Sequence, residues 1–310
     1  MVAVSVFGAA EVLHYHGGSG IVSIVLLSVA SAAGYGLAAV LQHRAAVVAA
    51  PELSMRAGLL VHLARRPLWL LGNALDGVGY LFQFLALRRG SLVLVEPLLV
   101  LSLVFALPVA AALDRRRVSP SEVASTGVVV AGLALFLGVA RPGLGHPDAS
   151  AEAWTVLSGV VSVVCVAAVT GARLRRGRPA AALLGFGSGL AFGYVAAVSE
   201  RTGHLLDAGV AHALASWEPY AMVVGATAAL LLTQSAFNAG DLRLSLPTLT
   251  VAQPLVAVAI GLVVFGEHIE VGGIAPVVEG LGLAMVTVGV FALGRSPVIG
   301  GGPVEVPPPT

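Results

Sequence analysis

The sequence has little of what a water-soluble protein of its length needs. Only 11% of its 310 residues are charged, lysine is absent, and the single cysteine, Cys165, has no partner for a disulfide or a cysteine-based metal site. The mean hydropathy is +0.95, and 57% of the residues are hydrophobic. Because this composition leaves too few polar groups to cover a soluble surface, we predict an integral membrane protein.

Sequence signatures of the common enzyme classes are also missing. The sequence has no pair of histidines at zinc-helix spacing and no Gly-x-Ser-x-Gly elbow, and its Gly-x-Gly step at Gly185–Gly187 lies in an apolar run with no strand before it. The arginine runs at 115–117 and 173–178 are explained by membrane topology and anionic lipid headgroups. We therefore expect no enzymatic activity, no cofactor and no nucleic-acid partner.

Nine apolar runs have the length of about 20 residues that crosses roughly 30 Å of hydrocarbon. Short connections separate them, so we expect an all-α integral membrane fold without a soluble domain. The basic segment Met55–Arg66 fits a short helix on the membrane surface, with a tenth, half-length span as the alternative. The nine runs are Ile21–Gln42, Leu68–Leu87, Leu92–Leu113, Val123–Ala140, Trp154–Ala172, Ala180–Ser199, Pro219–Asn238, Ser245–Phe265 and Gly272–Leu293.

The arginines predict the orientation of these spans. Nine crossings put the two termini on opposite sides of the membrane, and one side receives only Arg88, Arg89, Arg141 and Arg201 of the 17 basic residues. Since basic residues concentrate in cytoplasmic loops, the N-terminus is predicted outside the cell and the C-terminus in the cytoplasm of a cell-membrane protein. The other side receives Arg44, Arg56, Arg65, Arg66, Arg115, Arg116, Arg117, Arg173, Arg175, Arg176, Arg178, Arg243 and Arg295.

The apolar runs repeat within the chain. Glu96-Pro97-Leu98 lies near the start of the third run, and 157 residues later Gln253-Pro254-Leu255 lies in the eighth; the same offset relates Gly132 to Gly289. Gly34-Tyr35 likewise corresponds to Gly193-Tyr194 in the sixth run. Runs one to four thus match runs six to nine, and a single connecting run makes the two units enter the membrane from opposite sides. Inverted repeats of this kind are typical of transporters, with a cavity between the halves.

These residues resemble a known family. The order of a Gly-rich first helix, a helix pair with a short loop, a Glu/Gln-Pro-Leu helix and a Gly-containing last helix is similar to the EamA-like repeats of the drug/metabolite transporter superfamily, over about residues 21–294. The nine-helix count and the Leu41–Arg44 end of the first helix are also similar to NIPA-like magnesium transporters in that superfamily. Both resemblances imply transport and differ in the cargo that they imply.

On these grounds the chain divides into five parts. Residues 1–20 form an N-terminal extension without the features of a signal peptide, and residues 295–310, rich in proline and glycine, form a tail that we predict to be disordered. Between them, residues 21–140 are the first EamA-like repeat, 154–172 the connecting transmembrane helix and 180–294 the second repeat.

Asp76 is the strongest candidate for a binding residue. It lies about 12 Å into its span, and Asn73, Tyr80 and Gln83 share its side of the helix. A carboxylate at this depth costs about 2.5–3.5 kcal/mol on insertion scales, so it needs a compensating role. The corresponding second-unit helix carries its polar residues on one side too, and the two stripes either line a common cavity or make interhelical hydrogen bonds. The residues of this second stripe are Thr227, Gln234 and Asn238.

Three further polar residues lie in apolar runs beside prolines. Glu96 and Gln253 precede Pro97 and Pro254, where a missing backbone donor leaves a carbonyl free and allows a polar site or a hinge. Glu96 either joins that site or is solvated at the outer surface. Glu279, in the ninth run, is either a second site carboxylate or the partner of an arginine. We expect a secondary transporter that moves a small polar or cationic metabolite or drug-like compound by alternating access. The acidic residues favour either a cationic cargo or a proton carried in exchange, and a Mg²⁺ pathway and a non-transporting scaffold are the alternatives.

Overall fold

The structure is a computed structural model that describes residues 18–46, 57–140, 149–175, 177–239, 242–267 and 272–295. Within these ranges every regular element is a helix, and nine helical segments are long and apolar enough to cross a membrane. The prediction of an all-α membrane protein with nine spans is confirmed for this part of the chain. The expected N-terminal extension, apart from its last three residues, and the tail after Arg295 lie outside the described residues.

Eight of the spans are single helices, and the third is interrupted. It consists of α5 (Leu92–Leu98), the 3₁₀ turn η2 (Leu99–Leu101) and α6 (Ser102–Leu113), so the α-helix gives way to a 3₁₀ turn two residues after Pro97. The other spans are α2 (Gly18–Ala46), α4 (Pro67–Leu87), α7 (Pro120–Ala140), α8 (Ala151–Leu174), α9 (Arg178–Asp207), α11 (Glu218–Asn238), α12 (Leu242–Val263) and α13 (Ala275–Gly294).

Two short helices lie between spans. The basic segment after α2 contains α3 (Ala57–Leu63), in which Leu59 and Leu63 are fully buried and Val61 is exposed. At seven residues it is shorter than the predicted surface helix and far too short for a crossing. The second short helix, α10 (Val210–Ala215), joins α9 to α11.

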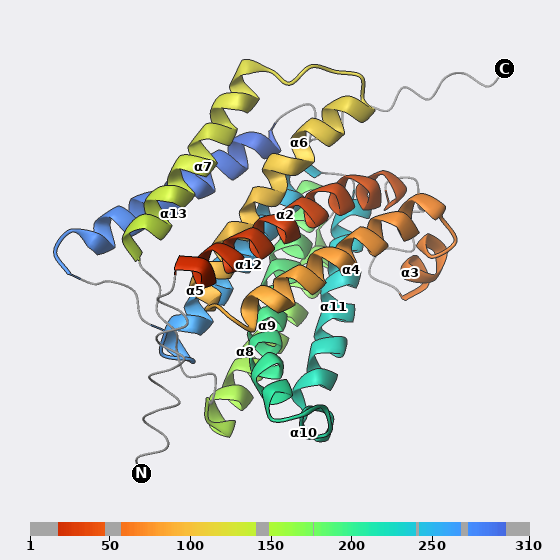
Figure 1. Cartoon of the computed structure of the whole chain (residues 1–310). Coiled ribbons are helices and arrows are strands. Elements are labelled where there is room, and N and C mark those ends of the chain that lie inside the picture. The colour runs from red at the N-terminus through yellow and green to blue at the C-terminus, as the bar shows by residue number, and fades with distance from the viewer. Residues whose placement is uncertain are drawn as a thin grey trace, which may run out of the picture.

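The spans pack in a recurring pattern. α2 lies against α4 and α6, α9 lies against α11 and α12, and α8 packs on α9. α7 and α13 pack on each other and lie side by side at one edge of the bundle in Figure 1. Valines on the outer faces, among them Val163, Val224 and Val288, are each about two-thirds exposed, with values of 69%, 69% and 65%. These apolar surfaces suit contact with lipid.

Glycines allow the closest helix contacts. A side chain at Gly185 would meet the carbonyl oxygen of Ser245 at 2.5 Å, and one at Gly189 would meet the carbonyl oxygen of Leu249 at 2.7 Å. Both glycines lie on the face of α9 that packs against α12. The glycine spacing of the sixth run therefore has a structural explanation, because only glycine leaves room for the backbone of the neighbouring helix.

One ion pair lies at each end of the helix bundle, and the two pairs serve to name its two faces. Arg44 at the end of α2 pairs with Asp114 after α6, and these residues define the Arg44 face. Arg88 after α4 pairs with Asp207 at the end of α9, 2.5 Å apart, and these residues define the Arg88 face. Since odd- and even-numbered crossings end on different faces, these pairs are those expected of helices that cross the membrane in alternating directions.

Candidate functional site

A cavity of about 440 Å³ lies between the two groups of helices. Its walls come from α2, α4, η2 with the start of α6, α9, α11 and α12. It reaches toward the Arg44 face at Gln42 and Phe237. The third span contributes lining residues only from Leu99 onward, and all seven residues of α5 are buried. α5 therefore separates the cavity from the Arg88 face.

Asp76 lines this cavity, as do Asn73 and Tyr80 from the same side of α4. The Asp76 side chain is partly accessible, and within the described part of the chain its carboxylate accepts no hydrogen bond and forms no ion pair. Its neighbours are held in place, since Asn73 Nδ2 donates to the Trp69 carbonyl at 3.0 Å and the Tyr80 hydroxyl lies 2.6 Å from Ser199 Oγ. The carboxylate is thus available to a cargo.

Glu96 lies on α5 and is fully buried. Gln83 Nε2 donates to one carboxylate oxygen at 2.5 Å, and Gln253 Nε2 donates to the other at 3.0 Å. The Tyr35 hydroxyl in turn donates to the Gln83 carbonyl. The interpretation of Glu96 as a solvated surface residue is therefore wrong. Its hydrogen bonds connect α5 to α4 and α12, directly beside the lining residues Tyr35 and Gln253.

The predicted stripe on α11 only partly faces the cavity. Thr227 lines it, whereas Gln234 is fully buried and donates through Nε2 to Gln42 Oε1 at 2.8 Å. Asn238 is half-buried near the end of α11 and is not a lining residue. The sequence left open whether these stripes line a cavity or make interhelical hydrogen bonds, and both occur. α4 and the middle of α11 line the cavity, whereas the end of α11 makes an interhelical hydrogen bond.

The remaining predicted site residues do not all lie at the cavity. Pro254 lines the cavity within the continuous helix α12, and Pro97 lies in a smaller hollow between α5, α7, α12 and α13. Glu279 is buried on α13, the helix that packs against α7, and is not part of the cavity lining. The structure thus does not bring Glu279 to Asp76.

Sequence reasoning missed several polar residues at or near the site. Tyr35 and Gln42 line the cavity, but their sequence context served only as a marker of the repeat. The sixth predicted run ends at Ser199, whereas α9 is 30 residues long, ends at Asp207 and buries Glu200. Glu267, placed after the eighth run, is buried as well. A signal for Glu200 was present, because its neighbours Thr202, Gly203, Leu205 and Leu206 continue a weakly apolar helix.

The cavity suits a solute with one charged or polar end. Asp76 is the acidic residue among the lining positions, and no basic residue lines the described cavity. Twelve of the 24 lining residues are Leu, Val, Ala, Met or Phe, and nine of these twelve come from α9, α11 and α12. Such a site neutralises a cation at one end and surrounds an apolar body elsewhere.

Comparison with known proteins places the chain among relatives without assigning its activity. No family model matches the sequence, and no solved structure matches it. An uncharacterized protein of Corynebacterium glutamicum is 32% identical over 275 residues, which cover 88% of this chain and 94% of that protein. At this identity and coverage, the chain belongs to the same family as the corynebacterial protein.

Proposed function

We propose that the protein is a secondary transporter of a small cationic or polar organic compound that works by alternating access. The observation that carries this proposal is the cavity of about 440 Å³ in which Asp76, at mid-span, accepts no hydrogen bond from the described residues. A carboxylate held inside a membrane bundle and open to a cavity is costly unless it binds cargo or a coupling ion.

We further propose that residues 21–140 and 180–294 are inverted repeats, as in the drug/metabolite transporter superfamily. Glu96 and Gln253 hydrogen-bond to each other, and their separation of 157 residues equals the offset of the repeat. Residues that are equivalent in two units and touch each other lie on the axis that relates the units. This contact supports a two-fold axis through the Glu96–Gln253 bond.

The packing of α7 on α13 supports the same axis. A side chain at Gly132 would meet the backbone nitrogen of Val286 at 2.9 Å, and one at Gly289 would meet that of Val129 at 3.1 Å. Gly132 and Gly289 are 157 positions apart, as are Val129 and Val286, so the repeat offset converts one contact into the other. A contact that is equivalent after exchange of the units is expected of a two-fold arrangement and not of two unrelated halves.

Alternating access in such a fold is a rocking of one unit against the other around a central site. Three contacts join the units near the Arg88 face: the Arg88–Asp207 pair, the Tyr80–Ser199 hydrogen bond and the hydrogen bonds from α5 to Glu267. In this proposal they close that face in the present conformation and break when the cavity opens there.

The lining does not favour the Mg²⁺ alternative. Magnesium needs several oxygen ligands and keeps part of its water shell. Asp76 has no second carboxylate beside it in the lining, and both oxygens of Glu96 are occupied by amide donors. The scaffold alternative is also less favoured, because the polar side of α4 faces a cavity.

Uptake into proteoliposomes tests the proposal. A panel of radiolabelled organic cations, zwitterions and neutral compounds of comparable size is offered to vesicles with and without a pH gradient, using empty vesicles as the control. We expect saturable uptake of at least one organic cation, and weaker uptake of its neutral analogue. Equal uptake by protein-containing and empty vesicles across the panel would contradict the transport proposal, and uptake of Mg²⁺ alone would replace it with the cation pathway.

A further inference from the structure

Two buried carboxyl groups lie near the N-terminal end of α5 and outside the cavity lining. Glu267 follows α12, and its two oxygens accept the backbone N–H groups of Leu92 and Val93, each at 2.9 Å. Glu200 of α9 lies near the same Leu92 N–H and interacts electrostatically with Glu267. Their exposed fractions are 3% for Glu200 and 4% for Glu267. Neither belongs to the site described above.

The partners of these two carboxyl groups are unequal. Glu267 has two backbone donors, whereas the Oε2 atom of Glu200 is buried and has no hydrogen-bond partner among the described residues. A buried ionised oxygen without a donor is strongly unfavourable, and two adjacent buried carboxylates repel each other. Both problems are relieved if one proton is held by the pair, with the Glu200 carboxyl donating to Glu267.

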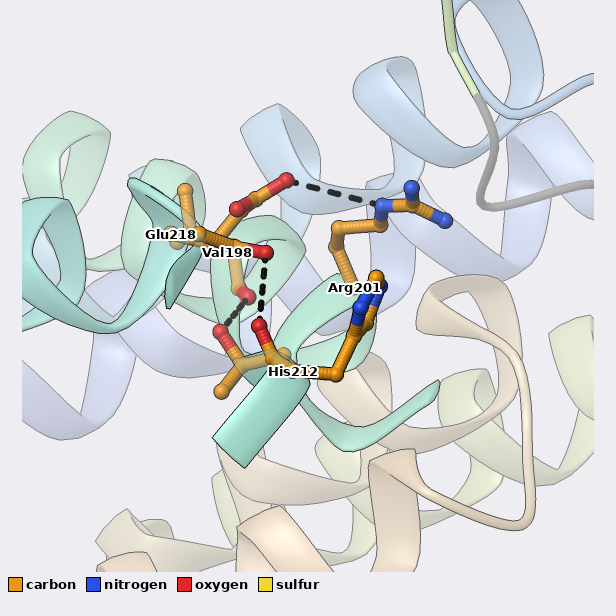
Figure 2. A network of polar contacts seen from close by, with 6 residues as sticks. Val198, Arg201, His212 and Glu218 are labelled. Carbon is orange, nitrogen blue, oxygen red and sulfur yellow. Dashed lines mark hydrogen bonds and ion pairs between the residues drawn. The ribbon is translucent and has the colours of Figure 1, made fainter. Parts of the chain in front are cut away.

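The charged groups around the pair do not neutralise it. Glu96 of α5 acts on Glu200 electrostatically and is itself acidic. Arg201, the next residue of α9, reaches toward Glu218 at the start of α11, with 3.6 Å between Nε and Oε1 (Figure 2). Arg88 of α4 pairs with Asp207. His204 lies one turn after Glu200 on α9 and is half-buried.

The fold makes room for this arrangement. The chain turns back after α12, so that the Glu267 N–H donates to the Gly261 carbonyl at 2.9 Å. A side chain at Gly261 would come within 2.6 Å of Glu267 Oε2. Burial raises the pKa of Glu267 to about 7, which is the range in which a physiological pH change alters its charge. Glu267 belongs to the second unit and Leu92 and Val93 to the first, so the pair lies at the junction of the proposed units.

We propose that Glu200 and Glu267 form a proton-binding carboxyl pair at the closed end of the cavity, and that loss of the shared proton weakens the contact between the units there. The second part rests on the transport function proposed above and names the proton as its coupling ion. Without the proton the two carboxylates, which both belong to the second unit, repel each other and push the end of α12 away from α9. This movement displaces Glu267 from the N–H groups of Leu92 and Val93, which belong to the first unit.

Infrared spectroscopy of the purified full-length protein during a pH titration tests the site. The carbonyl stretch of a protonated carboxyl group is a signal that no histidine produces. We expect a carboxyl band in the wild type that disappears as the pH rises through about neutral, and its loss in Glu200→Gln. The matched control is Glu122→Gln, since Glu122 is an equally buried carboxylate, 4% exposed, that accepts the Ser119 N–H on α7. The control should keep the band.

Two further measurements remove dependence on one variant. Gly261→Ala keeps both carboxyl groups but displaces Glu267, so the pH midpoint of the carboxyl band should shift.

The raised pKa of Glu267 means that its contribution to stability is full below about pH 4.3, the ordinary value for glutamic acid, and is lost as the pH rises through about 7. The melting temperature of the wild type should therefore fall over this range more steeply than that of Glu267→Gln.

The outcomes separate the two proposals. Absence of a titrating carboxyl band in the wild type, a band unchanged in both Glu200→Gln and Gly261→Ala, or a band that responds to Na⁺ and not to pH would overturn the proton pair. Uptake in Glu200→Gln proteoliposomes with the wild-type pH dependence would overturn its coupling role and leave transport standing. A titrating band in a protein that transports none of the offered compounds would sustain the pair and contradict the transport function.

Discussion

The two principal walls of the cavity come from α4 and α11, which the proposed repeat pairs with each other, and the two walls differ in chemistry. The α4 wall presents Asn73, Asp76 and Tyr80, whereas the α11 wall is apolar apart from Thr227 and Thr233. The helices that carry them pack alike, α4 on α2 and α11 on α9. A difference in chemistry on similar backbones points to the cargo, because packing alone does not require a charge on one wall only.

The same inequality recurs where the units meet. Glu96 is an acid, and Gln253, which the proposed repeat makes its equivalent, is an amide that donates a hydrogen bond to it. Under the proposed repeat, one unit supplies a carboxylate and the other a neutral donor, which avoids the repulsion of two buried acids on the proposed axis. Asp76 differs from Glu96 in having no such donor among the described residues. The Asp76 carboxylate therefore suits binding of a cargo, and the Glu96 carboxylate suits a structural role.

The largest expected effect comes from making the two walls alike. In Asp76→Asn the α4 wall loses its charge but keeps its shape, so transport of a cationic compound should fall about tenfold or more, which corresponds to roughly 1.4 kcal/mol or more of lost interaction. The melting temperature should stay nearly unchanged or rise, because a buried charge is removed. Uptake into proteoliposomes and thermal unfolding of the same preparation measure both.

Glu152→Gln is the matched control for this change. Glu152 is an exposed acid in the first turn of α8 and is not a lining residue. Its replacement should leave uptake at the wild-type rate. If Asp76→Asn transports as well as this control, with the same pH dependence, or if it fails to fold, then the charge on the α4 wall serves the structure and not the cargo.

The second largest effect concerns the shared carboxylate. Gln253→Leu removes the donor to one Glu96 oxygen, and Gln83→Leu removes the donor to the other together with the acceptor of the Tyr35 hydroxyl. Each should lower the free energy of unfolding by roughly 1–3 kcal/mol, because a buried group is left without its partner. Denaturation in detergent measures the loss.

The double variant with Glu96→Gln distinguishes this explanation from simple loss of packing. Replacing the carboxylate by an amide removes the unsatisfied charge, so Glu96→Gln should recover part of the stability lost in Gln253→Leu. If the stability losses of Gln253→Leu and Glu96→Gln simply add in the double variant, the Glu96 carboxylate is not the group that Gln253→Leu leaves without a partner.

Most of the fold was predictable because it depends on local properties. Runs of apolar residues must form helices in a bilayer, where the backbone has no water to bond, so their lengths give the nine spans. The 3.6-residue period then places Asn73, Asp76 and Tyr80 on one side of α4, and that side faces the cavity.

The positions of the other site residues depend on which helices pack against each other, and local sequence patterns do not contain this information. Glu279 lies at a depth similar to a site residue, but α13 packs on α7 and not on the cavity. Gln234 shares a stripe with Thr227 but meets Gln42 across the units. The sixth predicted run ends at Ser199, one residue before Glu200, whereas α9 extends to Asp207 and buries Glu200.

A third prediction transfers the charge from one wall to the other. Thr227→Asp in the Asp76→Asn background places a carboxylate on the α11 wall of the same cavity. If the cargo needs only one negative charge in the cavity, uptake of the organic cation should recover by a few-fold, on the order of 0.5–1 kcal/mol of interaction. The substrate concentration at half-maximal uptake measures this recovery. A complete lack of recovery in a folded variant would show that the position of Asp76 on α4 matters as much as its charge.

The smallest expected effect concerns two glycines of the α4 wall. Gly77 lines the cavity, and a side chain there would meet nothing within 4 Å; at Gly79 it would come within 3.1 Å of the Tyr35 ring and 3.2 Å of the Ser31 carbonyl oxygen. Gly77→Ala should therefore stabilise the helix by about 0.5–1 kcal/mol, whereas Gly79→Ala should lose this gain or reverse it.

The same two variants, assayed for uptake, sharpen the comparison of the walls. Gly79→Ala displaces Tyr35, whose hydroxyl donates to Gln83 and so supports the amide that holds Glu96. We expect Gly79→Ala to reduce uptake and Gly77→Ala to leave it nearly unchanged, because a single methyl group removes little of a cavity of about 440 Å³. A strong loss of uptake in Gly77→Ala, with its stability raised, would mean that the cargo passes directly against this turn of α4, and that the polar wall sets the size of the cargo as well as its charge.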